Sequence, residues 1–206
     1  MNRFLAYQFA RPSGWLGRWR IGPWLDRIGR PMNRLALEKL DLQQDETILE
    51  VGFGGGDLLA SLLAIPVAAV GGVDRSDAMV KRAERRFRKE IAAGRLIVHV
   101  GSAERLPLPE ARFDKACSVN TLYFWPDPAA VLAELARVLR PAGCVVLCFQ
   151  TPEAVCNWPG HRYGFHAYGA DRISGLMEAA GFHRPSKAVG RDPRLGEYVC
   201  LSSRKI

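Results

Sequence analysis

The chain has 206 residues, of which 48% are hydrophobic and 24% are charged, a composition typical of a single globular domain with a well-buried core. No apolar run approaches the ~20 residues that span a bilayer. The start of the chain lacks the apolar core and cleavage site of a signal peptide, so we expect a cytoplasmic protein. The five cysteines show no C-x-x-C spacing, and neither they nor the four histidines are spaced like metal ligands.

The net charge of +8 is concentrated near the N-terminus. Residues 1–40 contain eight basic and two acidic side chains, a net +6, together with three of the five tryptophans. Such an arm could bind an anionic membrane surface, nucleic acid or an acidic substrate, or it could be a solvated segment whose tryptophans cover the domain. Six glycines and prolines within residues 1–30 predict short helical pieces, followed by a helix over residues 31–41.

A glycine-rich turn follows the first predicted strand. Residues 47–51 form a β-branched, apolar run typical of a buried parallel strand, and residues 57–64 read as an apolar helix. Gly52, Gly54 and Gly56 separate them. Glycines at a strand-to-helix turn let a ligand approach main-chain N–H groups at a helix N-terminus. The dinucleotide fingerprint G-x-G-x-x-G does not fit, because its third glycine would fall on Asp57.

The second predicted strand, residues 67–73, leads into Asp74, which lies 24 residues after Glu50. Doubly wound nucleotide-binding folds place an acid at this position against ribose hydroxyls. Ser76 is the predicted N-cap of a helix that runs through residue 92. Six basic residues of that helix fall outside its apolar stripe, and we interpret them as a solvated face rather than a phosphate site.

Further elements are predicted along the rest of the chain. Polar and aromatic residues end the fourth strand, at the edge where parallel sheets bind ligands. Asp127 is an N-cap followed by proline. An aromatic segment without a clear period, residues 151–168, is expected to be a lid loop. The predicted elements are strands at 96–100, 113–120 and 144–149, helices at 128–140 and 170–180, and a C-terminal hairpin of strands within 182–195 and 197–202.

Three blocks carry a resemblance to a known family. The acid-x-Gly-x-Gly-x-Gly pattern that starts at Glu50 resembles motif I of the class I S-adenosylmethionine-dependent methyltransferases. Residues 101–109 are similar to the Gly-Asp-Ala-Glu-x-Leu-Pro-Phe segment of the ubiquinone and menaquinone biosynthesis methyltransferases, with Ser102 in place of the aspartate. Residues 137–143 resemble that family's Leu-Lys-Pro-Gly-Gly block.

The resemblance implies an α/β, Rossmann-like fold. Its seven-stranded sheet would be parallel except for one antiparallel strand near the C-terminal edge, with helices on both faces. Residues 1–206 would form one domain, with a helical cap at 1–41 and a core at 42–206. The implied cofactor is S-adenosylmethionine, converted to S-adenosylhomocysteine. Its implied contacts are Glu50, Gly52, Gly54 and Gly56 at the methionine end, Asp74 at the ribose, Met79, Ala103 and Glu104 at the adenine, and Asn120 on the sulfonium side.

Methyl transfer from a sulfonium needs alignment and exclusion of water more than acid–base chemistry. If the acceptor must lose a proton, His161 or His166 on the predicted lid is the candidate base. Tyr123, a further candidate catalytic residue, and Trp125 could place aromatic faces near the cationic donor, or they could pack in the core. We expect a small-molecule acceptor. Two alternatives stay open: a phospholipid headgroup or other membrane substrate, and an RNA methyltransferase or a non-catalytic S-adenosylmethionine-binding protein. Nucleic acid is disfavoured because residues 120–123 differ from the Asn/Asp-Pro-Pro-aromatic motif of amino-group methylases.

Overall fold

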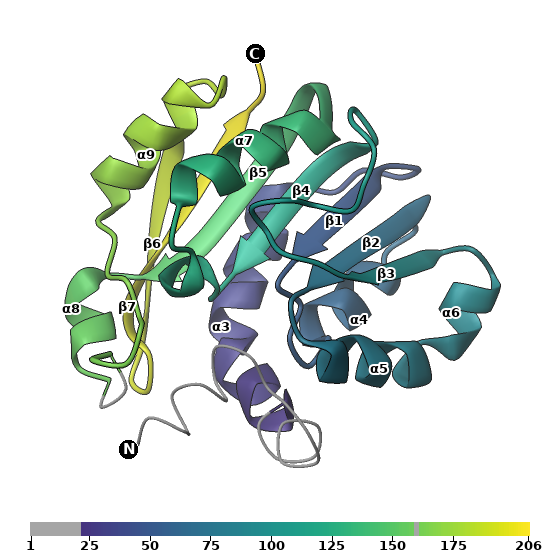
Figure 1. Cartoon of the computed structure of the whole chain (residues 1–206), viewed down its shortest axis with the longest axis horizontal. Helices are drawn as coiled ribbons and strands as arrows, with labels where there is room; N and C mark the ends of the chain where they lie inside the picture. The colour runs from purple at the N-terminus through teal and green to yellow at the C-terminus, as the bar shows by residue number, and fades with distance from the viewer. Residues whose placement is uncertain (1–21, 159–160) are drawn as a thin grey trace.

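The computed structural model describes residues 22–158 and 161–206 (Figure 1). Helices and strands alternate through most of this part of the chain, as the sequence patterns predict. The elements are α3 (Gly22–Leu40), β1 (Thr47–Val51), α4 (Asp57–Leu63), β2 (Ala69–Asp74), α5 (Asp77–Arg86), α6 (Arg88–Ala92), β3 (Leu96–Val100), β4 (Phe113–Val119), the 3-10 helix η2 (Leu122–Phe124), α7 (Pro128–Val138), β5 (Leu139–Gln150), α8 (Pro152–Cys156), α9 (Ala170–Ala179), β6 (Ser186–Asp192) and β7 (Gly196–Arg204).

The seven strands form one sheet in the order β3-β2-β1-β4-β5-β7-β6. Strands β1 to β5 pair in parallel, and β7 runs antiparallel to both β5 and β6. The predicted fold class is therefore confirmed, including the antiparallel strand near the C-terminal edge. The chain reverses its direction of winding at β1, so β1 and β4 are neighbours and a crevice opens beyond their carboxyl ends.

Helices cover both faces of the sheet (Figure 1). One apolar cluster packs α7 and α9 against the sheet, with Leu132, Leu135 and Ile173 fully buried. The other cluster packs α3, α4 and α5 against the opposite face. Because the central strands are covered on both sides, their near-continuous apolar runs are buried on both faces, which is the reason they could be recognised in the sequence.

Helix α3 corrects the prediction for the N-terminal segment. It starts at Gly22 rather than near residue 31, and Pro31 lies inside it. The i, i+4 row of Met32, Ala36 and Leu40 is buried against the sheet, and Gly29 on the other side of the proline is buried too, so the buried side of α3 continues across Pro31. Residues 1–21, which carry most of the predicted basic arm, lie outside the described residues.

Lys115 of β4 anchors the C-terminal end of α3. Its buried ammonium donates to the main-chain oxygen of Leu40 at 2.7 Å and to that of Asp41, and it pairs with Glu46 at 2.9 Å. The last carbonyls of a helix have no partner within the helix, and a cation there complements the helix dipole. Lys115 therefore fixes where α3 leaves the sheet.

The predicted helix over residues 76–92 is divided into α5 and α6 at Phe87. Ser76 caps α5 as expected, because its hydroxyl accepts from the Met79 N–H at 3.3 Å. The backbone leaves the helical region at Phe87, whose ring is buried below the glycine turn. A Cβ added to Gly56 would meet that ring at 3.0 Å. Packing of this aromatic ring explains the interruption better than local helix propensity does.

Two further boundaries differ from the prediction. Helix α7 begins after the N-cap Asp127 as predicted but ends at Val138, and β5 starts at Leu139, so residues 141–143 lie within the strand rather than before it. The segment 151–168 is not wholly irregular, since α8 occupies Pro152–Cys156 with Thr151 as its N-cap. Cys156 therefore ends a helix, while the other four cysteines lie in strands.

Candidate active site

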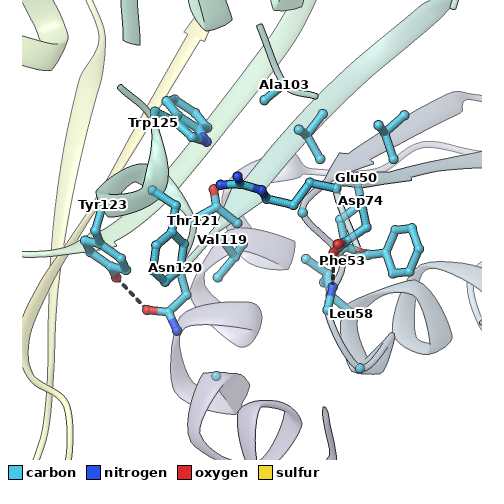
Figure 2. Close-up of a pocket in the computed structure, with 18 of the residues that line it drawn as sticks. Glu50, Phe53, Leu58, Asp74, Ala103, Val119, Asn120, Thr121, Tyr123 and Trp125 are labelled. Atoms are coloured by element: carbon cyan, nitrogen blue, oxygen red, sulfur yellow. Dashed lines mark hydrogen bonds between the residues drawn. The ribbon is translucent and has the colours of Figure 1, made fainter. Parts of the chain in front are cut away.

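A pocket of about 360 Å³ opens at the carboxyl ends of β1, β2 and β4, a volume within the range of small-molecule sites (Figure 2). The loops that follow these strands and β3 supply most of its wall, and α3 and the segment after α8 close it. Its lining includes Gly29, Asn33, Glu50, Gly52, Phe53, Gly54, Asp57, Asp74, Arg75, Ser102, Ala103, Glu104, Asn120, Thr121, Tyr123, Phe124, Trp125, Gln150, Val155, Trp158 and Phe165.

The glycine turn forms the floor of this pocket. Gly52, Gly54 and Gly56 have φ angles of 80°, 53° and 83°, which L-residues with side chains rarely adopt. Gly56 is the N-cap of α4 and does not itself line the pocket, whereas Gly52 and Gly54 do. A Cβ added to Gly54 would have no protein atom within 4 Å. The turn therefore leaves open space above its backbone.

Two arginines hold this turn from below. Arg82 Nε and Arg86 Nη1 both donate to the Gly55 oxygen, at 3.3 and 3.0 Å, and Arg86 lies 3.9 Å from the Asp57 carboxylate. The prediction of a purely solvated basic face is wrong for these two residues. Their contacts hold the carbonyl of Gly55, a residue of the turn that lines the pocket.

Asp74 sits at the end of β2 beside the turn. One carboxylate oxygen accepts from the Gly54 N–H and the other from the Ser76 N–H, each at 2.8 Å. Burial raises the pKa of Asp74 above its ordinary value of 3.8, and the two backbone hydrogen bonds oppose that rise. Each carboxylate oxygen has a second lone pair, so the group can still accept hydrogen bonds from a ligand.

Glu50 lies at the end of β1 and is only 3% exposed, although its side chain lines the pocket. A carboxylate with so little access to water attracts a cationic ligand group strongly, because opposite charges interact more strongly where water is excluded. On the other side of Asp74, Ser102, Ala103 and Glu104 follow β3, and the Ser102 hydroxyl donates to the Glu104 carboxylate. Ser102 thus helps to orient the Glu104 carboxylate, which also lines the pocket.

The end of β4 brings Asn120 and Tyr123 together. Asn120 has a φ of 61° and is partly buried. The Tyr123 hydroxyl donates to Asn120 Oδ1 at 2.5 Å and accepts from the Gln150 N–H at 3.1 Å. Burial raises the pKa of Tyr123 far above its ordinary value of 10.0, so this phenol stays protonated and is not a general base. As a candidate catalytic residue, Tyr123 can therefore act through its ring or its hydrogen bonds but not by accepting a proton.

Three other predicted residues lie away from the pocket. The Met79 side chain is fully buried in the core beneath α5. His161 Nδ1 lies 2.8 Å from the Trp158 oxygen, and the exposed ring of His166 stacks on Tyr168 with their centroids 5.9 Å apart. None of the three lines the pocket. A role at the adenine for Met79 and a role as base for either histidine have no support in this geometry.

Sequence reasoning missed several lining residues. Gly29 and Asn33 enter from α3, one helical turn apart, and Arg30 between them pairs with Asp57 at 3.3 Å. Arg75, Gln150 and a group of apolar side chains were also missed. The i, i+4 spacing of Gly29 and Asn33 was the available signal, but it was obscured by taking Pro31 as the helix start. The missed apolar residues include Phe53, whereas Phe124 follows the strand end that was predicted to face the ligand, and Val155, Trp158 and Phe165 lie within the predicted lid segment.

No helix in the described ranges is long and apolar enough to cross a bilayer. Within the same ranges, no three histidine, cysteine, aspartate or glutamate side chains gather as a possible metal site.

Known proteins resemble this chain in sequence and in fold. Residues 49–147 match the model of a family described as a methyltransferase domain. The uncharacterized methyltransferase YdaC of Bacillus subtilis is 35% identical over 124 residues, which cover 60% of this chain and 66% of that protein. The ubiquinone/menaquinone biosynthesis C-methyltransferase UbiE of Geotalea daltonii is 30% identical over 142 residues, 68% of this chain and 60% of that protein. A SAM-dependent methyltransferase from Aquifex aeolicus has a TM-score of 0.69 at 19% identity, with 100% of both chains covered.

Fold and site together define a Rossmann-like α/β protein with a ligand pocket at the switch point of its sheet. With the family match, the chain carries a methyltransferase domain, and its fold is that of the S-adenosylmethionine-dependent methyltransferase from Aquifex aeolicus. The matched region covers about two thirds or less of the length of these curated relatives.

Proposed function

We propose that this chain transfers a methyl group from S-adenosylmethionine to a small-molecule acceptor with a flat, apolar body. One observation carries the proposal: the pocket does not end at the glycine turn but continues into a half lined by aromatic side chains. The similar C-methyltransferase is named for a biosynthetic reaction, which also supports a small acceptor. The first half fits the donor and the second half has the chemistry of an acceptor site.

The donor half matches the three chemical parts of S-adenosylmethionine. Glu50 offers a buried carboxylate to the cationic amino-acid end. Asp74 offers carboxylate lone pairs to the ribose hydroxyls, and Ala103 and Glu104 flank the space left for the adenine. The open space above Gly54 admits the ligand close to the backbone. These residues are the ones we propose to hold the cofactor.

The acceptor half is formed by rings that already contact each other. The Tyr123 and Phe165 rings lie nearly parallel with their centroids 6.3 Å apart, and Phe124 meets Phe165 edge-on at 4.8 Å. Trp125 and Val155 add buried apolar surface. Such a wall favours a flat apolar molecule, because aromatic pairs gain energy beyond the area that they bury.

The bound cofactor supplies a methyl group on a sulfonium, which is already activated for displacement by a nucleophile. The chain must then align the acceptor and keep water out. Among the described residues of the aromatic wall, Tyr123 has the titratable side chain, and burial keeps it protonated. The aromatic wall therefore provides no general base. The acceptor therefore has to bring a nucleophilic atom that reacts without a base from this aromatic wall.

A paired substitution on one segment tests the acceptor half. Phe165 lines the pocket, whereas Tyr163, two residues earlier, is 44% exposed and does not. Acceptors would first be found by incubating the protein with methyl-labelled S-adenosylmethionine and fractionated small-molecule extracts. Phe165→Ala should then raise KM for the acceptor at least several-fold without changing cofactor affinity, and Tyr163→Ala should change neither. Equal effects of the two substitutions would contradict the assignment.

The alternatives give different results in the same assay. A membrane substrate would require liposomes for turnover, and binding through the basic arm of residues 1–40 would weaken as salt shortens the screening length below the ~10 Å of 0.1 M. An RNA substrate would place the label in nucleic acid. Cofactor binding without label transfer to any fraction would favour a non-catalytic binding protein.

A further inference from the structure

The hydroxyl of Tyr123 lies between two polar groups, and one of them is fixed by the sheet. The Gln150 N–H belongs to the last residue of β5 and donates to the phenol oxygen at 3.1 Å. On the other side, the phenol contacts the side-chain amide of Asn120 at 2.5 Å (Figure 2). The Tyr123 residue is 4% exposed, so its hydroxyl must satisfy its hydrogen bonds within the protein.

This arrangement fixes which way the Asn120 amide is turned. A backbone N–H can only donate, so the phenol oxygen accepts at that side and its own proton is directed to Asn120. The atom of Asn120 that receives this proton must be the carbonyl oxygen Oδ1. The amide NH₂ group therefore points away from Tyr123, and Figure 2 shows the nitrogen on the branch of the amide that the dashed line does not reach. Two N–H donors are thus presented by a residue that lines the pocket.

The order of the strands indicates which ligand group these donors meet. The sheet runs β3-β2-β1-β4, and the residues proposed for adenine, ribose and amino-acid end follow β3, β2 and β1 in that order. Asn120 follows β4 and so continues the same series beyond Glu50. Its backbone φ of 61° turns the chain at this point, a conformation that asparagine tolerates better than most residues. The donors therefore lie at the amino-acid end of the cofactor.

We propose that Tyr123 is a positioning residue, which holds the Asn120 NH₂ group as a hydrogen-bond donor to the carboxylate of the cofactor's amino-acid end. Glu50 would then bind the ammonium group and Asn120 the carboxylate of that amino-acid end, from the adjacent strands β1 and β4. The inference rests on the proposed function, because it assumes the same cofactor in the same pocket. It also gives the buried Tyr123 hydroxyl a role in cofactor binding.

Two ligands and three variants test the proposal by calorimetry. S-adenosylhomocysteine carries the amino-acid end, whereas 5′-methylthioadenosine has the same adenosine and sulfur without it. Tyr123→Phe keeps the ring and removes the hydroxyl, and Asn120→Gly removes the amide while suiting the positive φ. Each should weaken S-adenosylhomocysteine about tenfold, the worth of one hydrogen bond to a charged group, and leave 5′-methylthioadenosine unchanged.

The double variant separates positioning from general support of the fold. If Tyr123 acts through Asn120, Tyr123→Phe should have no further effect on S-adenosylhomocysteine affinity in the Asn120→Gly background. A tenfold further loss there would overturn the proposal, and so would an equal loss of both ligands in the single variants. Failure of the wild-type protein to bind either ligand would instead refute the proposed function, and the inference with it.

Discussion

Gly54 offers the sharpest test of the cofactor pocket, because a matched glycine exists elsewhere in the fold. Gly54 and Gly94 both have positive φ angles, of 53° and 70°, and a Cβ added to either would meet no protein atom within 4 Å. Gly54 lines the pocket, whereas Gly94 lies in the exposed turn before β3. Substituting each by alanine therefore imposes the same backbone penalty at two sites, of which one faces the ligand.

The expected magnitudes follow from this geometry. A left-handed backbone costs an L-residue about 1–2 kcal/mol, so both Gly54→Ala and Gly94→Ala should lower the free energy of unfolding by a similar amount. For a domain of this size that is roughly 2–8 °C in Tm. Only Gly54→Ala places a methyl group in ligand space, and overpacking of that kind costs about 1–3 kcal/mol, or roughly 5- to 150-fold in Kd.

Calorimetry with S-adenosylhomocysteine and a thermal melt of each variant supply both quantities. Normal affinity in Gly54→Ala would mean that the turn is not the cofactor cradle. Equal losses of affinity in the two variants would show that backbone strain, and not the occupied space, is responsible. In either case the assignment of the donor half would be wrong.

Three further predictions concern other side chains. Asp74→Ala should weaken S-adenosylhomocysteine by about 1–3 kcal/mol. Because burial raises the pKa of Asp74, wild-type affinity should fall as pH drops toward that raised pKa, above the ordinary 3.8, and titrations of the variant should lack this component. Lys115→Met should lower the free energy of unfolding in denaturant by about 1–3 kcal/mol, because the main-chain oxygens of Leu40 and Asp41 and the Glu46 carboxylate would lose their ammonium partner. Lys39→Met, which removes a surface pair, should change it by less than about 1 kcal/mol and serves as its control. His161→Ala and His166→Ala should keep kcat within about twofold, because neither side chain lines the pocket; a large loss in kcat would restore one as the base.

Local sequence patterns were sufficient to predict the part of the pocket that is built by the glycine turn and the ends of β1 and β2. The strand at residues 47–51, the positive-φ glycines and the N-cap Ser76 depend on interactions within a few residues, and each was found where expected. Asp74 could be placed because it ends a buried strand, and parallel strands bring their carboxyl ends to one edge. The fold class followed from the same alternation of buried strands and amphipathic helices.

Contacts between distant segments decided the rest. The preference of proline for a first helical turn starts a helix at Pro31, but α3 begins nine residues earlier, at Gly22, and brings the buried Gly29 as well as Asn33 to the pocket. The orientation of Asn120 depends on the Gln150 N–H, which is thirty residues away in the chain and adjacent only through the sheet. The sequence by itself determined the cradle, since its geometry is encoded in backbone preferences. Only the tertiary structure decided the aromatic half and the direction of its polar groups, because packing and hydrogen bonding between separate elements have no local signature.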